Sequence, residues 1–126
     1  MKVATGLKAA GIFFAYEPDC IKYDSPVKGA KCRACNAPAV FRAAHYTPDF
    51  KLGNGSYIET KGRFTSRDRT KLIAFRVTNP QIVLRLLFQS PNNWCTKQHK
   101  MTYGQWATKN GFEWAGGTEV PHKWTT

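Results

Sequence analysis

The chain has 126 residues, a length that fits one domain with one modest hydrophobic core. Hydrophobic residues make up 42% of it, a globular composition that argues against a largely disordered chain. Lysines and arginines number 19 against 8 acidic residues, and the resulting net charge of +11 favours a polyanionic partner such as nucleic acid. No apolar run approaches the roughly 20 residues that span a bilayer. The start of the chain lacks the apolar segment of a signal peptide, so we expect a cytoplasmic protein without a membrane partner.

The first third of the chain predicts short elements separated by turns. Residues 2–10 place apolar side chains on one helical face and stop at a glycine, which predicts a helix. Residues 12–16 are aromatic and β-prone, and they predict a strand. Residues 24–38 are rich in proline, glycine, lysine and cysteine, and this composition indicates a loop or a small metal-clipped knob.

A β-hairpin is predicted next, because Asn54-Gly55 is the strongest turn signal in the chain. It separates a strand that begins over 49–51 from a strand over 57–61. Folding the second strand back along the first places Asp49 near Glu59. The side chains of Glu59 and Lys61, two residues apart, point to the same face of the sheet. Two carboxylates and one ammonium group are therefore expected at one place.

That group of side chains suits the hydrolysis of a phosphodiester. A carboxylate from each strand can hold Mg²⁺ and leave room for water and phosphate, and the carbonyl of Thr60 lies between them as a further ligand. The metal would polarise the phosphate, while Lys61 orients a water molecule or offsets charge at phosphorus. The alternative reading is that Glu59 and Lys61 form an exposed pair on a strand and that Asp49 is a turn residue.

The second half of the chain predicts two helices around a buried strand. Residues 66–79 have helical spacing of apolar side chains, with Ser66 as a candidate N-cap and a proline just after the end. Residues 82–89 are dense in branched apolar residues and predict a buried strand. Residues 102–110 predict a helix that ends at Gly111. The order of these elements predicts an α/β fold with a mixed sheet flanked by helices.

Pro48-Asp49 followed by Glu59-Thr60-Lys61 resembles the PD-(D/E)xK nuclease signature. The surrounding segments 45–50 and 58–62 are similar to those of the bacteriophage endonuclease I family, whose members resolve Holliday junctions and other branched DNA. The likeness continues in Lys2-Val3, Gly11-Ile12, Asp68-Arg69, Thr102-Tyr103-Gly104, Asn110-Gly111, Val120-Pro121 and Trp124. It covers roughly the whole chain apart from residues 24–44.

This resemblance implies a restriction-endonuclease-like fold over residues 1–126, and an endodeoxyribonuclease that uses Mg²⁺ or Mn²⁺ on branched DNA. Asp49 and Glu59 would bind the catalytic metal, and Lys61 would be the catalytic lysine. An intertwined homodimer is implied as well, and a place in the host cytoplasm if the source is a bacteriophage. Two alternatives remain open, namely a nuclease acting on unbranched DNA and a DNA-binding module that has lost catalysis.

The chain departs from the family at two places. A further catalytic glutamate of the family precedes the match to Lys2-Val3, and that position falls before Met1. We therefore expect that the true start lies upstream, that the sequence is trimmed, or that the protein works without this residue. The second departure is a cysteine-bearing stretch, which occupies the place of the short bridge between subunits.

Cys32 and Cys35 form one half of a zinc site in a Cys-x-x-Cys arrangement. Cys20 and His45 are the candidates to complete it, with Cys95 a remoter choice. This interpretation predicts a zinc-binding insertion at about 20–45. The alternative is that the thiols are unligated on a loop.

Basic residues follow the acidic pair closely and recur in a later loop, and we expect them to hold DNA phosphates rather than to read bases. Trp94 and His99 lie in or beside that later loop. Arg85, within the apolar strand, suggests a structural ion pair instead. The predicted phosphate contacts are Arg63, Arg67, Arg69, Lys71, Arg76, Lys97 and Lys100.

Overall fold

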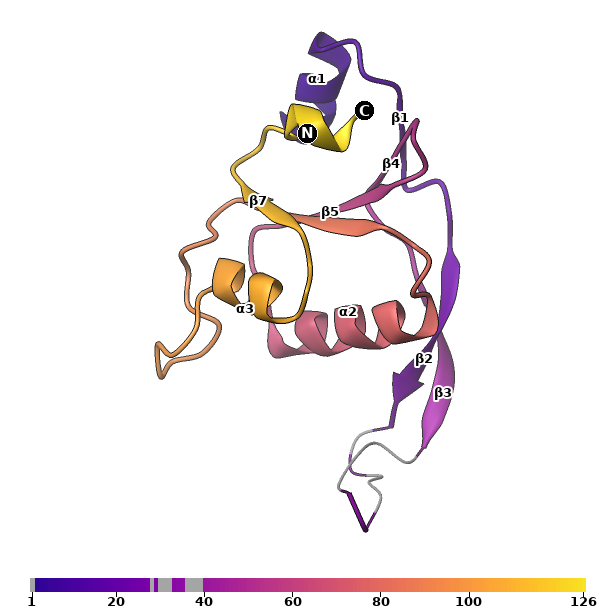
Figure 1. Ribbon diagram of the computed structural model, residues 1–126, viewed down its shortest axis with the longest axis vertical. Helices are drawn as coiled ribbons and strands as arrows, with labels where there is room; N and C mark the ends of the chain where they lie inside the picture. Colours follow the sequence, from indigo (N-terminus) through magenta and orange to yellow (C-terminus); the bar gives the residue numbers. More distant parts are fainter. Residues whose placement is uncertain (1, 28, 30–32, 36–39) are drawn as a thin grey trace.

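The computed structural model describes residues 2–27, 29, 33–35 and 40–126. A five-stranded sheet forms its centre, in the order β1-β4-β5-β6-β7 (Figure 1). Its strands are β1 (Phe14–Tyr16), β4 (Phe50–Leu52), β5 (Tyr57–Lys61), β6 (Leu84–Phe88) and β7 (Trp114–Gly116). Separately, β2 (Ile21–Pro26) and β3 (Phe41–Tyr46) pair with each other in a two-stranded sheet. The predicted α/β class with a mixed sheet and flanking helices is confirmed.

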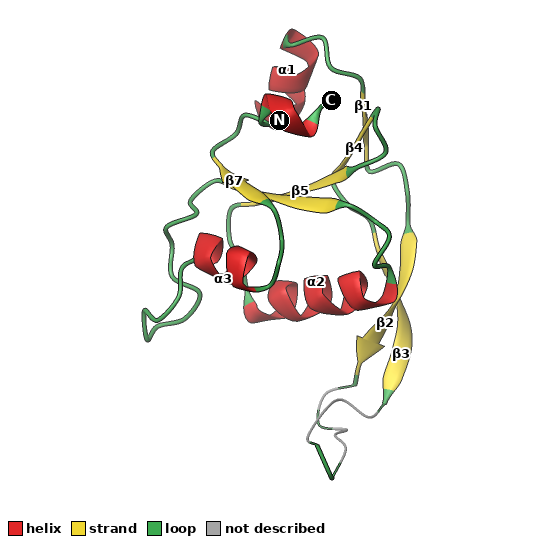
Figure 2. Cartoon of the chain, in the orientation of Figure 1, coloured by secondary structure: helices red, strands yellow, loops and turns green. Residues whose placement is uncertain are grey.

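The pairing of neighbouring strands changes from antiparallel to parallel at β5, in the middle of the sheet. The pairs β1–β4 and β4–β5 are antiparallel, and the pairs β5–β6 and β6–β7 are parallel. Parallel neighbours need a crossover, and helices α2 (Ser66–Thr78) and α3 (Tyr103–Lys109) supply the two crossovers. Figure 2 shows both helices on one side of the sheet, while α1 (Lys2–Ala9) and the C-terminal turn η1 (His122–Trp124) lie on the other.

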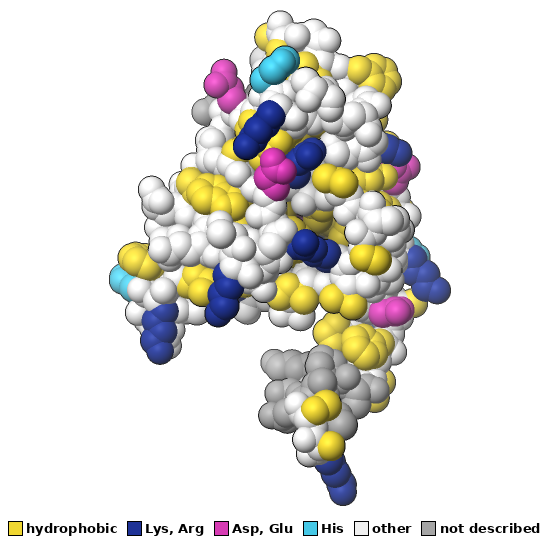
Figure 3. Space-filling model, in the orientation of Figure 1, with side chains coloured by type: hydrophobic (Ala, Val, Ile, Leu, Met, Phe, Trp, Pro, Cys, Tyr) yellow, Lys and Arg dark blue, Asp and Glu magenta, His cyan; other side chains and the backbone are white. Residues whose placement is uncertain are grey.

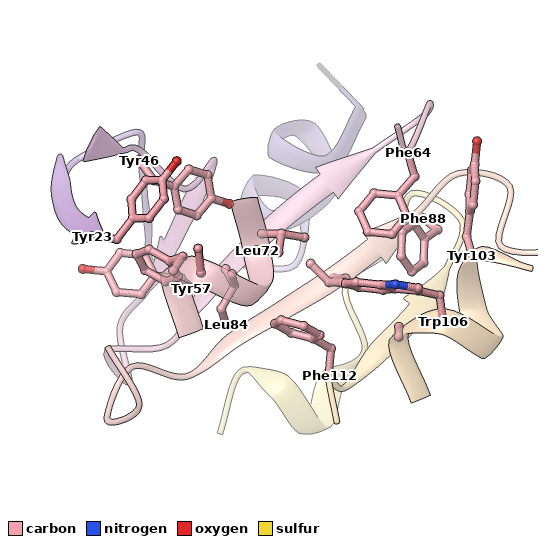
Figure 4. Packing of buried hydrophobic residues seen from close by; sticks show 14 residues of the cluster. Tyr23, Tyr46, Tyr57, Phe64, Leu72, Leu84, Phe88, Tyr103, Trp106 and Phe112 are labelled. Carbon is pink, nitrogen blue, oxygen red and sulfur yellow. The ribbon is translucent and has the colours of Figure 1, made fainter. Parts of the chain in front are cut away.

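Two cores lie on the two faces of the sheet because side chains alternate along each strand. Ile58 and Leu87 pack with Val3, Leu7 and Trp124 on the side of α1 and η1. The larger core lies on the side of α2 and α3, as Figure 4 shows. Its labelled members are Tyr23, Tyr46, Tyr57, Phe64, Leu72, Leu84, Phe88, Tyr103, Trp106 and Phe112. Glu59 and Lys61 share the parity of Tyr57, so their side chains belong to this second side.

Both crossover helices begin with a capping box. Thr65 caps α2 by accepting from the backbone N–H of Asp68, and the Asp68 carboxylate accepts in return from the backbone N–H of Thr65. Thr102 and Gln105 form the equivalent capping box for α3. The sequence prediction of Ser66 as the N-cap was therefore wrong by one residue, because the hydroxyl with a partner three residues later is that of Thr65.

The arm formed by β2 and β3 extends beyond the end of α2 (Figure 1). Its base is tied to that helix, since the backbone N–H of Asp24 donates to Thr78 Oγ1 at 3.0 Å and Asn79 Nδ2 donates to the carbonyl of Lys22 at 3.1 Å. The predicted loop over 24–38 was wrong for residues 24–26, which belong to β2. Of the remainder, only 27, 29 and 33–35 are among the described residues.

The hairpin and the second half of the chain follow the sequence prediction closely. The predicted strand over 57–61 is β5, and Gly55 takes the positive φ of 88° that its turn requires. The expected helices over 2–10, 66–79 and 102–110 are present with ends one or two residues shorter. The strands predicted over 12–16 and 82–89 are shorter than expected, at Phe14–Tyr16 and Leu84–Phe88.

Among the described residues, no helix is long and apolar enough to cross a membrane.

Candidate active site

The hairpin of β4 and β5 places the two predicted carboxylates side by side. Phe50 pairs with Ile58 in the antiparallel register, so Asp49 and Glu59 are the next residues along the two strands. The backbone N–H of Asp49 donates to Glu59 Oε1 at 3.1 Å. The structure therefore brings together the acidic pair that the turn at Asn54-Gly55 predicts.

Thr60 fixes the orientation of the Asp49 carboxylate. Its backbone N–H donates to Asp49 Oδ2 at 2.9 Å, and its hydroxyl donates to the same oxygen at 2.7 Å. Asp49 Oδ1 has no hydrogen-bond partner among the described residues. One oxygen of Asp49 is thus held by the next strand, and the other is free to bind a ligand.

Glu59 is a buried acid beside another acid. Only 5% of the residue is exposed, and burial together with the negative charge of Asp49 raises the pKa of its carboxyl, against an opposing effect of Lys61. The buried hydroxyl of Tyr46 lies next to Glu59 and has no hydrogen-bond partner among the described residues. Burial and the nearby charge of Glu59 raise the pKa of that phenol. Such a pair of carboxylates is suited to a cation.

Lys61 lies between the acidic pair and the start of α2. Its Nζ is 3.5 Å from Glu59 Oε2 and 3.2 Å from Asp68 Oδ1, and its side chain is 17% exposed. Burial by itself would raise the pKa of Asp68, but hydrogen bonds from Thr65 and the charge of Lys61 together lower it. Asp68 therefore both caps α2 and positions Lys61.

The donor set fits a hard divalent cation. Such ions prefer carboxylate and carbonyl oxygens, and the cluster offers Asp49 Oδ1 beside the buried Glu59 carboxylate. The main-chain N–H of Tyr57 and the main-chain carbonyl of Lys61 form hydrogen bonds on the side of β6, whereas the N–H of Thr60 points to Asp49. Because the N–H and C=O of a strand residue lie on the same edge, the Thr60 carbonyl is directed to the Asp49 side. This is the position that the predicted third ligand needs.

The predicted basic residues fall into three groups. Arg63, Arg69 and Lys97 line one open groove of about 610 Å³ next to the end of β5. Arg67 and Lys100 are exposed nearby in sequence, at the start of α2 and in the loop before α3. Figure 3 shows a lysine or arginine side chain at the projecting end of that loop and others scattered over this face of the molecule.

The third group makes contacts within the fold. Lys71 Nζ lies 4.6 Å from the centre of the Tyr46 ring. Arg76 Nη1 donates to the carbonyl of Asn110 at 2.8 Å, and its guanidinium covers the Phe112 ring. Arg85 Nε pairs with Glu113 Oε2 at 3.0 Å, so the expected structural ion pair of Arg85 is present.

The predicted zinc ligands lie along the β2–β3 arm. Cys20 and His45 are at its base, because Ile21 pairs with Tyr46 and Lys22 with His45. Cys35 lies beyond the opposite end, which is about 17 Å away at roughly 3.3 Å per strand residue. Cys32 is outside the described residues, and the described ones contain no group of three or more His, Cys, Asp and Glu side chains suited to a metal. The zinc site stays a prediction.

Two residues of the cluster were missed from the sequence. Asp68 carried a usable signal for its capping role, since Thr65-x-x-Asp68 before an apolar run has the form of a capping box, but no sequence pattern gives its contact with Lys61. Tyr46 carried none, because a tyrosine in a strand is usually part of the core.

The fold and the site define an α/β protein that gathers an acidic pair and a lysine at the open end of a hairpin, beside a cationic groove. The model of one protein family, described as phage endonuclease I, matches residues 1–126. The chain belongs to this family, as the residues around Asp49 and Glu59 predicted.

Two relatives are similar to nearly the whole chain. Endodeoxyribonuclease 1 of Enterobacteria phage T3 is 36% identical over 115 residues, which are 90% of this chain and 66% of the relative. Endonuclease I of Escherichia phage T7 is 32% identical over 123 residues, which are 98% of this chain and 72% of the relative. The chain thus spans about two thirds of the length of these relatives.

Proposed function

We propose that this protein is a metal-dependent endodeoxyribonuclease that hydrolyses phosphodiester bonds in branched DNA. The observation that carries the proposal is the meeting of Asp49, Glu59 and Lys61 at the end of the β4–β5 hairpin, within contact distances of 3.1 and 3.5 Å. Membership of the phage endonuclease I family and the printed names of the two relatives support a nuclease that acts on DNA.

Asp49 and Glu59, with the carbonyl of Thr60, would hold one or more Mg²⁺ or Mn²⁺ ions. Such an ion supplies Lewis acidity at the phosphate and lowers the pKa of a water molecule. Thr60 keeps the Asp49 carboxylate in place through two hydrogen bonds. Lys61 offers an ammonium group to a phosphate oxygen or to the attacking water, and Asp68 holds that group near the cluster.

The proposals of a branched DNA substrate and of a homodimer rest on the family resemblance. A branch is recognised by its shape, which requires cationic surface placed to contact more than one duplex arm rather than base-reading side chains. The net charge of +11 and the groove lined by Arg63, Arg69 and Lys97 are consistent with that mode of binding. A second copy of the chain would supply a second hairpin and allow cuts in two strands.

The test is a cleavage assay on a four-way junction and on a duplex of matched sequence, with Mg²⁺ or with EDTA. We expect the junction to be cut preferentially and only with the metal. Lys61→Ala should lower the rate at least about 100-fold and largely spare binding. Lys8→Ala is the matched control, because Lys8 is an exposed residue of α1 on the opposite side of the sheet. Unchanged cleavage by Lys61→Ala would refute the assignment of the site.

The same assay separates the two alternative functions. Equal cutting of the duplex and the junction would indicate a nuclease for unbranched DNA. Tight binding without cutting, under conditions in which a known nuclease cuts the same substrates, would indicate a DNA-binding module that has lost catalysis.

A further inference from the structure

A cationic groove lies between the segment that follows β5 and the loop between β6 and α3. It starts at Arg63, two residues after Lys61, and Arg69 on α2 and Lys97 in the loop also line it. None of the described residues that line it is acidic. Arg63 and Lys97 form no ion pair within the described part of the chain, whereas Arg69 donates to the carbonyl of Phe64 at 2.9 Å. The groove is thus suited to a polyanion.

An aromatic pair is among the residues that line this groove. The rings of Trp94 and His99 are stacked, with centroids 5.0 Å apart and an interplanar angle of 13°, and both residues line the groove. Trp94 is 45% exposed, so the indole keeps a large accessible surface beside the imidazole. Neither Trp94 nor His99 belongs to the two cores, so the packing of the cores does not explain why these two rings are held together.

The loop holds the pair in a fixed geometry. Trp94 forms a bridge with Thr102, the backbone N–H of Cys95 donates to the carbonyl of Met101 at 2.9 Å, and that of His99 donates to Thr96 at 3.2 Å. His99 has a φ of 54°, a left-handed conformation that costs a non-glycine residue free energy. The loop maintains this conformation, and with it the ring of His99 against Trp94.

Cationic side chains and an exposed aromatic surface along one groove are the combination that binds single-stranded nucleic acid. A duplex base is already stacked on its neighbours, so only an unpaired base can stack on a protein ring. We propose that this groove holds one or two unpaired nucleotides next to the scissile phosphate, with a base stacked on Trp94 and phosphates bound by Arg63 and Lys97. This inference rests on the proposed function, because it takes the DNA strand to lie over Lys61.

The binding test uses no catalysis, so its failure is distinct from failure of the proposed function. Fluorescein-labelled oligo(dT) of 12 nucleotides and a blunt duplex of 12 base pairs are titrated with the protein in EDTA, with fluorescence anisotropy as the readout. One stacked base contributes about 1–3 kcal/mol, so Trp94→Ala should weaken binding of the single strand about 5- to 150-fold. Binding of the duplex should change less than twofold. Trp94→Phe should retain part of the affinity because a smaller ring still stacks.

The control variant is Phe13→Ala, which removes an aromatic side chain that is 79% exposed and lies outside the groove. It should bind both DNAs as the wild type does, and circular dichroism should confirm that every variant is folded. Oligo(dT) should also quench tryptophan fluorescence in the wild type and much less in Trp94→Phe, since Trp106 and Trp124 are buried and Trp114 is partly buried against the core. Equal losses of single-strand and duplex binding in Trp94→Ala, or no loss of either, would overturn the inference. Mg²⁺-dependent cleavage by the same wild-type preparation reports separately on the proposed function.

Discussion

At the scale of single residues, the grouping of Asp49, Glu59 and Lys61 is unfavourable for the stability of the fold. Glu59 is buried beside Asp49, and two adjacent carboxylates are favourable only with a cation between them. The ammonium group of Lys61 offsets part of the repulsion between the two carboxylates, but it also forms an ion pair with Asp68. The buried hydroxyl of Tyr46 is a further polar group without a partner among the described residues. Such conflicts are expected where a site is arranged for a ligand rather than for the fold.

Glu59→Gln should stabilise the metal-free protein at neutral pH. Burial and the charge of Asp49 raise the pKa of Glu59 in the folded state, so the unfolded chain releases this proton at a lower pH than the folded chain does. Folding stability therefore falls as pH rises from the unfolded pKa to the folded pKa, and the penalty persists above that. We expect a rise in Tm on the order of 3 °C at pH 7 in EDTA, measured by thermal unfolding, and almost none near pH 3.

The same substitution tests the metal site. The proposed Mg²⁺ site exists in the folded state only, so Mg²⁺ should raise the Tm of the wild type and leave that of Glu59→Gln nearly unchanged. A variant that is less stable than the wild type at pH 7 would show that Glu59 contributes to the fold through its partners rather than opposing it.

At the scale of elements, close packing fixes α3 against the edge of the sheet. A Cβ atom added at Gly104 would lie 2.6 Å from Cζ2 of Trp114, a rigid ring of β7. Tyr103 and Trp106 on the same helix are core residues, so α3 has little freedom to move away. Glycine at this position is required by the close approach of helix and strand.

Gly104→Ala should destabilise the protein by about 1–3 kcal/mol, because the helix or the indole must shift to accommodate the methyl group. Gly6→Ala is the matched control in α1, where nothing lies within 4 Å of the added Cβ. There the change should stabilise by about 0.5–1 kcal/mol, since alanine loses less backbone entropy in a helix. Chemical denaturation curves measure both, and equal effects of the two substitutions would contradict the packing argument.

How far the sequence predicts these elements depends on whether the signal is local. The β4–β5 hairpin was predictable because Asn54-Gly55 specifies the turn and the spacing of Asp49 and Glu59 follows from it. The β2–β3 arm was not predictable, because the composition of the segment between its strands does not indicate that they pair. Its contact with α2 also depends on backbone groups such as the N–H of Asp24. The contact of Lys61 with Asp68 depends on the path of the chain between β5 and α2, which no spacing rule gives.

At the scale of the whole molecule, exposed basic residues lie around the candidate site. The start of α2 and the loop before α3 carry exposed basic residues around the groove, on the side of the sheet that also contains Glu59 and Lys61. The opposite side is covered by α1 and η1 and carries the second core. A DNA molecule attracted by the net charge of +11 is expected to bind on the α2 side.

The salt dependence of duplex binding should reveal which side of the sheet contacts DNA. Each phosphate contact contributes about 0.9 to the slope of log K against log salt concentration, because binding releases counterions from the duplex. Arg67 is exposed in the first turn of α2, so Arg67→Gln should weaken binding and lower the magnitude of that slope by about one. Lys8→Gln removes the same charge from the exposed surface of α1, on the other side of the sheet, and it should leave the slope unchanged. Binding measured by anisotropy at several salt concentrations decides between the faces: a reduced slope in Lys8→Gln with an unchanged slope in Arg67→Gln would place the DNA on the α1 side, away from Glu59 and Lys61.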